Sequence, residues 1–249
     1  MSDHTPPAAT ATLIAIAFAF STLERYLRAR KRHELMWTLS LFMFAAGSLG
    51  LWMGAAFGWG EFNFKVFYLF GAILNVPFLA LGTVHLLTRN QRRSDVIAAS
   101  VALLSAFATG IVVASPVIGT IDPRTLPRGS EVFGLGPRIL AAVASGLASV
   151  VIIGGAVWSA LRLVLSHRKP GHATLLSPGR LALANVLIAI GTLILGAGGL
   201  SNSVLDAMDT FAVSLVVGIA VIFGGFLLTN TAPPVKPWYP SIVREDRAA

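Results

Sequence analysis

The chain contains no cysteine, and only 12% of its 249 residues are charged. Without cysteine, disulfide bonds, thiol catalysis and thiolate-ligated metal sites are excluded. Soluble domains carry about 25% charged residues. Because 55% of this chain is hydrophobic, it is expected to be an integral membrane protein with no separate soluble domain.

The chain has seven apolar segments, and each is long enough to cross a bilayer as a helix, which takes about 20 residues. They are Ala8–Leu27, Leu35–Gly58, Phe64–Leu87, Val96–Ile118, Pro137–Leu165, Arg180–Leu200 and Ala207–Asn230. Strands of a membrane barrel would be about 10 residues long and would alternate in polarity, whereas these segments are continuous. The sequence predicts an all-α polytopic membrane protein. Residues 1–230 would form a single seven-helix domain, and 231–249 a proline-rich cytoplasmic tail.

The basic residues predict the orientation. Of the 19 lysines and arginines, 15 lie in the links after the first, third and fifth segments or in the tail. The other four are Lys65, Arg124, Arg128 and Arg138. The positive-inside rule then places the N-terminus outside and the C-terminus in the cytoplasm. Termini on opposite sides agree with an odd number of spans, and the expected location is the plasma membrane. The net charge of +8 is thus a topology signal, and no nucleic-acid partner is expected.

The start of the chain has no basic stretch of the kind that opens a signal peptide, so the first segment is expected to remain as an anchor.

The most informative stretch is Glu61–Thr88, which is long enough to span but holds polar residues and a helix breaker. Pro77 removes a backbone donor near the middle of this span, and Asn75 can supply hydrogen bonds there. Asn185 lies midway through the sixth segment. Polar groups at this depth face other helices or a cavity. Both asparagines are expected to point inward, either into a shared ligand cavity or as polar contacts between helices.

A second candidate site collects charges at the outer ends of the helices. Glu61 and Lys65 are spaced to pair along one helical face. Arg138 is expected near the start of the fifth helix, and Asp206 and Asp209 near the start of the seventh. The outer loop between the fourth and fifth segments, about 20 residues long, is a candidate lid. The alternative interpretation is that these residues are helix caps and interfacial ion pairs.

Other patterns have structural interpretations. Gly50, Gly54 and Gly58 form a double GxxxG, which predicts close helix packing. The aromatic residues Trp37, Trp52, Trp59, Trp158 and Tyr68 are expected in interfacial belts. Four of the five histidines are expected on the cytoplasmic side, but their spacing matches no HxxxH or HExxH pattern, so no metal or cofactor is predicted.

The first three and the last three segments look like two loosely similar triplets, each with a basic link after its first helix and a third helix ending in Leu-Leu-Thr. This pattern predicts a 3+1+3 arrangement with parallel repeats.

Three resemblances follow from these residues. The seven-helix plan resembles microbial rhodopsins, but the last segment lacks the lysine that retinal needs, and Lys65 lies in the wrong helix. The triplets resemble SWEET-type sugar transporters, but the last segment lacks the corresponding proline. The block from Gly58 to Leu87, preceded by the ELMW of residues 34–37, is similar to uncharacterised multi-pass membrane proteins of actinobacterial type. This last resemblance implies a membrane fold and no particular activity.

Three functional hypotheses remain. The favoured one is a non-enzymatic sensor, receptor-like or accessory membrane module that lies in the lipid bilayer and binds a small ligand or a membrane-protein partner. The second is a small-solute or ion transporter, although the chain lacks the mid-membrane carboxylate expected of a coupled pump. The third, an intramembrane enzyme acting on lipid, lacks any visible nucleophile–base pair.

Overall fold

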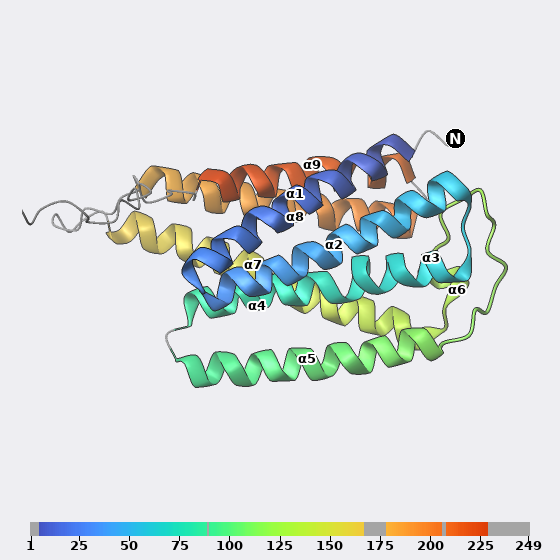
Figure 1. Ribbon diagram of the computed structural model, residues 1–249, viewed down its shortest axis with the longest axis horizontal. Helices are drawn as coiled ribbons and strands as arrows, with labels where there is room; N and C mark the ends of the chain where they lie inside the picture. The colour runs from blue at the N-terminus through green and yellow to red at the C-terminus, as the bar shows by residue number, and fades with distance from the viewer. Residues whose placement is uncertain (1–4, 89, 167–177, 206–207, 229–249) are drawn as a thin grey trace, which may run out of the picture.

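The computed structural model describes residues 5–88, 90–166, 178–205 and 208–228, and this part of the chain is a bundle of helices without strands (Figure 1). The proline-rich tail and Asp206 lie outside the described residues. In chain order the helices are α1 (Thr5–Ala29), α2 (Arg32–Phe57), α3 (Glu61–Val66), the π-helix η1 (Phe67–Leu74), α4 (Asn75–Leu87), α5 (Gln91–Ala114), α6 (Gly129–Val132), α7 (Leu135–Ser166), α8 (Pro178–Leu205) and α9 (Met208–Leu228).

Within the described residues, six helical stretches are long and apolar enough to cross a membrane. They are α1, α2, the continuous α3–η1–α4 stretch, α5, most of α7, and α9. The prediction of an all-helical membrane protein is therefore confirmed. Helix α8 is 28 residues long and contains a shorter apolar stretch, Val186–Gly199.

The predicted bounds of the fourth segment are wrong at both ends. Helix α5 begins at Gln91, because the Asn90 side chain caps it by accepting a hydrogen bond from the Arg93 backbone N–H at 3.2 Å. It ends at Ala114, because Ser115 precedes Pro116 and takes an extended conformation there. The predicted segment followed the hydrophobic run alone, so it missed the Asn90 cap before the run and passed over Pro116 within it.

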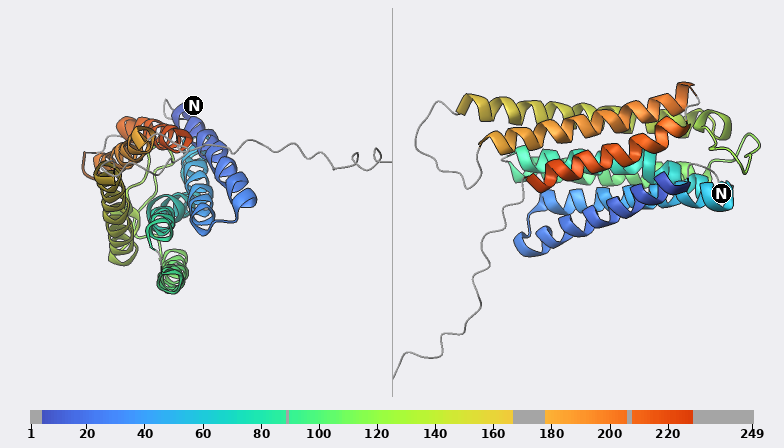
Figure 2. Two further views of the ribbon diagram at one scale, coloured as in Figure 1. Left: turned by 90° about the vertical axis from the view of Figure 1, so that its left-hand side faces the viewer. Right: turned by 90° about the horizontal axis from the view of Figure 1, so that it is seen from above.

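Six of the long helices pack in a ring. Helix α1 packs on α2, α2 on α4 and η1, α4 on α7, α7 on α8, α8 on α9, and α9 on α1. The end-on view shows α5 at the periphery, beside α4 (Figure 2). Only 11% of the apolar stretch of α5 is buried, against 50% for α2 and for α9, so most of the α5 surface faces outward.

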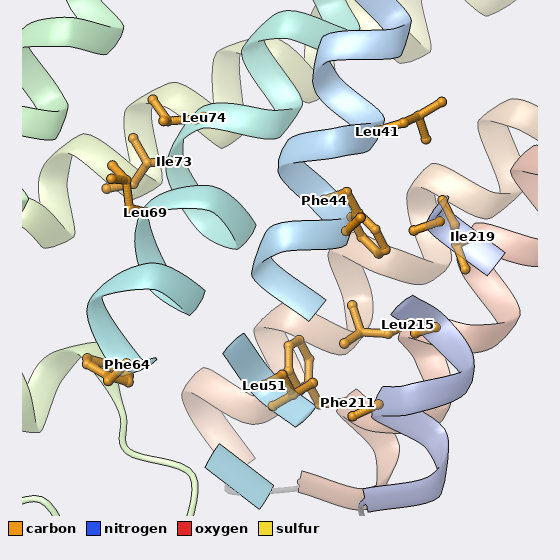
Figure 3. Packing of buried hydrophobic residues seen from close by; sticks show 14 of the residues in the cluster. Leu41, Phe44, Leu51, Phe64, Leu69, Ile73, Leu74, Phe211, Leu215 and Ile219 are labelled. Atoms are coloured by element: carbon orange, nitrogen blue, oxygen red, sulfur yellow. The ribbon is translucent and has the colours of Figure 1, made fainter. Parts of the chain in front are cut away.

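Part of the hydrophobic core lies between α1, α2 and α9. Small residues on one face of α1 let its neighbours approach closely, and all four are at most 1% exposed: Ala8, Ala11, Ala15 and Ala19. Figure 3 shows Phe44 and Leu51 of α2 near Leu215 and Phe211 of α9. Phe18 of α1 stacks on Phe223 of α9 with ring centroids 4.7 Å apart. These contacts hold the first and last spanning helices together.

Glycine sets the distance between α2 and η1. A Cβ added to Gly47 would lie 2.8 Å from the backbone of Gly71, and one added to Gly50 would lie 3.0 Å from the Phe67 nitrogen. The predicted packing role of the glycine stripe is therefore confirmed at Gly50, and the stripe extends back to Gly47. Gly58 has a different role, because it ends α2 with a φ of 97°, which other residues rarely adopt.

Replacing Gly47 with alanine should destabilise the protein by about 1–3 kcal/mol, because the new methyl group meets backbone that cannot move aside. The measurement is thermal or denaturant unfolding of the purified protein in detergent. Gly110→Ala on α5 is the matched control, because nothing lies within 4 Å of its added Cβ. That control should be neutral or slightly stabilising. Equal stability of the two variants would contradict the close contact between α2 and η1.

Candidate functional site

The third spanning stretch changes its helical geometry in mid-course. After the six residues of α3 it becomes the π-helix η1 over Phe67–Leu74, and it returns to α-helix at Asn75. π-Helices are rare, usually occupy a single turn, and frequently occur at functional sites. We refer to Phe67–Pro77 as the helix break. The sequence predicted a polar interruption here but not this wider helix.

Serine hydroxyls from two neighbouring helices bond to the backbone of the helix break. Pro77 has no N–H, so the carbonyl of Ala72, five residues before it, lacks the donor that a π-turn would supply. The hydroxyl of Ser145 on α7 donates to that carbonyl. The hydroxyl of Ser40 on α2 donates to the Asn75 carbonyl at 2.8 Å. Hydrogen bonds thus tie the break to both sides of the bundle.

Asn75 points inward, as predicted, and its side chain is incompletely paired. The residue is 6% exposed, and Oδ1 has no hydrogen-bond partner. A buried acceptor without a partner costs about 1–3 kcal/mol, so native proteins seldom keep one without a reason. Asn75 is therefore the residue of the helix break best placed to receive a donor from a bound molecule.

Asn185 was predicted to face Asn75 across the bundle, but its helix α8 is not among the main neighbours of α4 in the described residues. Helix α4 packs against α2, α5 and α7, whereas α8, which holds Asn185, packs against α7 and α9. The side chains of Asn185 and Asp209 lie outside the described residues. Pro77 itself is half-buried on α4.

At the start of the third spanning stretch, Lys65 acts as a structural residue. Its Nζ lies 2.8 Å from Glu61 Oε1, which confirms the predicted pair, and it donates to the Val113 carbonyl at 3.0 Å. Val113 is in the last turn of α5, where carbonyls lack helical partners and favour a cation. Arg138, in the first turn of α7, is exposed. Lys65 therefore caps a helix, in line with the structural interpretation of the outer charges.

The loop between α5 and α7, predicted as an outer lid, is packed onto the bundle. Val132 and Phe133 are 1% and 2% exposed, and the Phe133 ring lies 5.5 Å from Phe64. Backbone bonds fix two further points, from Ile118 to Val132 and from Trp59 to Pro123, both at 3.0 Å. These anchors argue against a lid that swings open. They also correct the expectation for Trp59, which is 5% exposed and belongs to the core.

An open cavity of about 330 Å³ lies at the opposite end, between the α1–α2 link and the start of α5. Five basic or titratable side chains line it, together with Thr88, Gln91 and Ser94; the five are Arg30, Lys31, Arg32, His33 and His85. We call this space the basic-end cavity. The charge pattern placed these links on one side of the membrane, but it could not show that they enclose a space.

Beside this cavity, a nearly buried ion pair joins α1 to α2. Arg25 Nη2 lies 2.7 Å from Glu34 Oε1, and the Glu34 side chain is 3% exposed. The Arg25 guanidinium also lies 4.2 Å from the centroid of the Phe226 ring on α9. His33 Nε2 is 3.6 Å from the same carboxylate oxygen. Arg25 thus contacts both neighbours of α1 in the ring.

Among the described residues, no three histidine or carboxylate groups lie close enough together to hold a metal ion. No protein-family model, curated protein or solved structure matches this chain. The resemblance to actinobacterial multi-pass proteins therefore stays a prediction.

Replacing Arg25 with methionine should destabilise the protein by about 3 kcal/mol, because it leaves the Glu34 carboxylate buried without a counter-charge. The control is Arg28→Met, which breaks the exposed pair with Glu24 and should cost less than about 1 kcal/mol. Adding Glu34→Leu to Arg25→Met should restore most of the lost stability. Unfolding in detergent measures all three variants, and equal losses for Arg25→Met and Arg28→Met would contradict this role.

Proposed function

We propose that this chain is a non-enzymatic sensor, receptor-like or accessory module that binds a small ligand or a membrane-protein partner at the helix break. The observation that carries the proposal is the incompletely paired Asn75 at the end of a rare π-helix in the third spanning stretch. A bound molecule that donates to Oδ1 would satisfy this acceptor. Ligand binding then explains why the protein keeps a buried acceptor whose lack of a partner lowers its stability.

The proposed topology has seven spans in the plasma membrane, with the N-terminus outside and the C-terminus in the cytoplasm. Helix α8 would bring the count from six spans to seven, as the sixth in chain order, and its length of 28 residues supports this count. The α1–α2 and α4–α5 links meet at the basic-end cavity, while the α2–α3 and α5–α7 links meet through the bond from Trp59 to Pro123. The basic residues therefore favour the end with the basic-end cavity as the cytoplasmic end of the bundle.

The ring supports the proposed 3+1+3 repeat. If α1, α2 and α4 correspond to α7, α8 and α9, every contact between adjacent helices of the ring has a counterpart in the other triplet. The α1–α2 contact corresponds to α7–α8, α2–α4 to α8–α9, and α4–α7 to α9–α1. The unmatched helix, α5, lies outside. This is the arrangement expected of parallel repeats, which several transporters share, and it keeps a small-solute or ion transporter as the second candidate.

Replacing Asn75 with leucine tests whether the residue is kept for binding. If it is, the variant should be as stable as the wild type or up to about 1 kcal/mol more stable, because an unpaired acceptor is removed. It should also lose any small molecule that native mass spectrometry detects on wild-type protein extracted from membranes.

Ser40→Ala is the matched control, because it removes a satisfied hydrogen bond to the same residue and should cost about 1 kcal/mol. A large loss of stability in Asn75→Leu would instead make Asn75 a structural contact and would count against the proposal. Solute uptake in proteoliposomes that Asn75→Leu abolishes would favour the transporter.

Because the chain has no cysteine, single cysteines can report its orientation. Thr125→Cys in the outer loop and Gln91→Cys at the start of α5 both lie at exposed positions. In intact cells a membrane-impermeant maleimide should label Thr125→Cys and should label Gln91→Cys only after permeabilisation. The reverse pattern would invert the proposed topology.

A further inference from the structure

Positive charge is concentrated at the basic-end cavity, because the link between α1 and α2 is too short to keep its basic side chains apart. Residues Arg30 and Lys31 connect α1 to α2, and Arg32 opens α2. All three are exposed and line the cavity, and His33 and His85 complete its walls. Like charges held this close repel one another, so a bound anion would stabilise the arrangement.

Only part of this charge is neutralised within the protein. Arg32 forms an ion pair with Asp95 of α5, which ties the two sides of the cavity together. In the described part of the chain, neither Arg30 nor Lys31 has a carboxylate within ion-pair distance. The guanidinium of Arg30 lies only over the Tyr26 ring, 5.5 Å from its centroid. The positively charged side chains of Arg30 and Lys31 therefore remain available to bind an anion in the basic-end cavity.

Neutral donors surround the same space. Thr88, Gln91 and Ser94 line it, although the Ser94 hydroxyl already donates to the Gln91 carbonyl at 2.9 Å. The first turn of α2 has no side-chain cap for its free N–H groups. A helix start with uncapped N–H groups favours an anion. Charged and neutral donors that approach from two links suit a group with several acceptor oxygens on different sides, as in phosphate.

The size and the position of the cavity agree with such a ligand. Its volume of about 330 Å³ is at the lower end of the roughly 300–1,000 Å³ of small-molecule sites. It lies where spanning helices end, which is the depth of lipid headgroups, and basic pockets between helices at this depth bind anionic headgroups.

We propose that the basic-end cavity binds a phosphate group, presented either by the headgroup of an anionic phospholipid or by a soluble phosphate compound. Arg30 and Lys31 supply the free charge, and the Thr88 hydroxyl and the Gln91 side-chain amide complete the donor set. This site is separate from the helix break. Loss of phosphate binding would therefore leave the proposed function of Asn75 untouched.

The test compares two double variants that remove the same charge at the same end. Arg30→Gly with Lys31→Gln takes both free cations from the cavity. The link should be retained, because Arg30 has a φ of 52°, which glycine adopts without strain. Arg92→Gln with Arg93→Gln is the control, since both arginines are exposed in the first turn of α5 and neither lines the cavity. Helical circular dichroism confirms that each variant folds.

Two probes separate the sources of phosphate. Delipidated protein in a neutral maltoside detergent is mixed with phosphatidylglycerol or with phosphatidylcholine, and the bound lipid is counted by native mass spectrometry. The same protein is titrated with inorganic phosphate by calorimetry. The cavity variant should bind at least about tenfold more weakly than the wild type, because charge-assisted hydrogen bonds are lost. The control should bind like the wild type.

Selective retention of phosphatidylglycerol without binding of inorganic phosphate would identify a lipid headgroup. Binding of inorganic phosphate by the lipid-free protein, lost in the cavity variant, would identify a soluble phosphate compound. The proposal is overturned if the wild type binds neither probe better than the cavity variant does. It is also overturned if the control loses as much binding as the cavity variant, since net charge alone would then explain the affinity.

Discussion

The close approach of α2 to η1 is the contact on which the rest of the bundle depends. Gly47 and Gly71 let the two backbones meet without side chains between them. Only at this separation can the Ser40 hydroxyl reach the Asn75 carbonyl across the interface. The π-helix then needs a second donor on its other side, and Ser145 of α7 provides it. One glycine contact thus positions the helix break with respect to both halves of the ring.

Much of the architecture follows from the sequence because hydrophobic length is a strong physical constraint in lipid. It predicted the six stretches that are long and apolar enough to span, the inward-facing Asn75 and the pair between Lys65 and Glu61. It could not predict the π-helix, because Pro77 removes a donor without specifying how the preceding turn widens. Nor could it predict that Phe133 and Trp59 are buried, since an aromatic residue near a helix end suits a belt as well as a core.

The two candidate sites differ in how they are built. At the helix break the polar groups belong to the backbone and to small side chains, so their positions are set by helix packing. At the basic-end cavity they belong to long, exposed side chains on short links, held in place by Arg32 and Asp95. The first site is suited to recognising shape and hydrogen bonding, and the second to attracting charge. The sequence pointed to the first through Asn75, whereas the second needed the spatial meeting of two links.

The peripheral place of α5 has a consequence for how the chain enters the membrane. A unit of three spans begins and ends on opposite sides, so a second unit joined directly to it would insert with the opposite polarity. In the proposed topology, α5 adds the single crossing that returns the chain to its starting side. Such a helix needs apolar side chains on most of its surface, where lipid surrounds it, and it contacts few other helices. The exposed Leu103, Leu104 and Phe107 agree with this requirement. Its main requirement is to span, which leaves its sequence freer to vary than that of any helix in the ring.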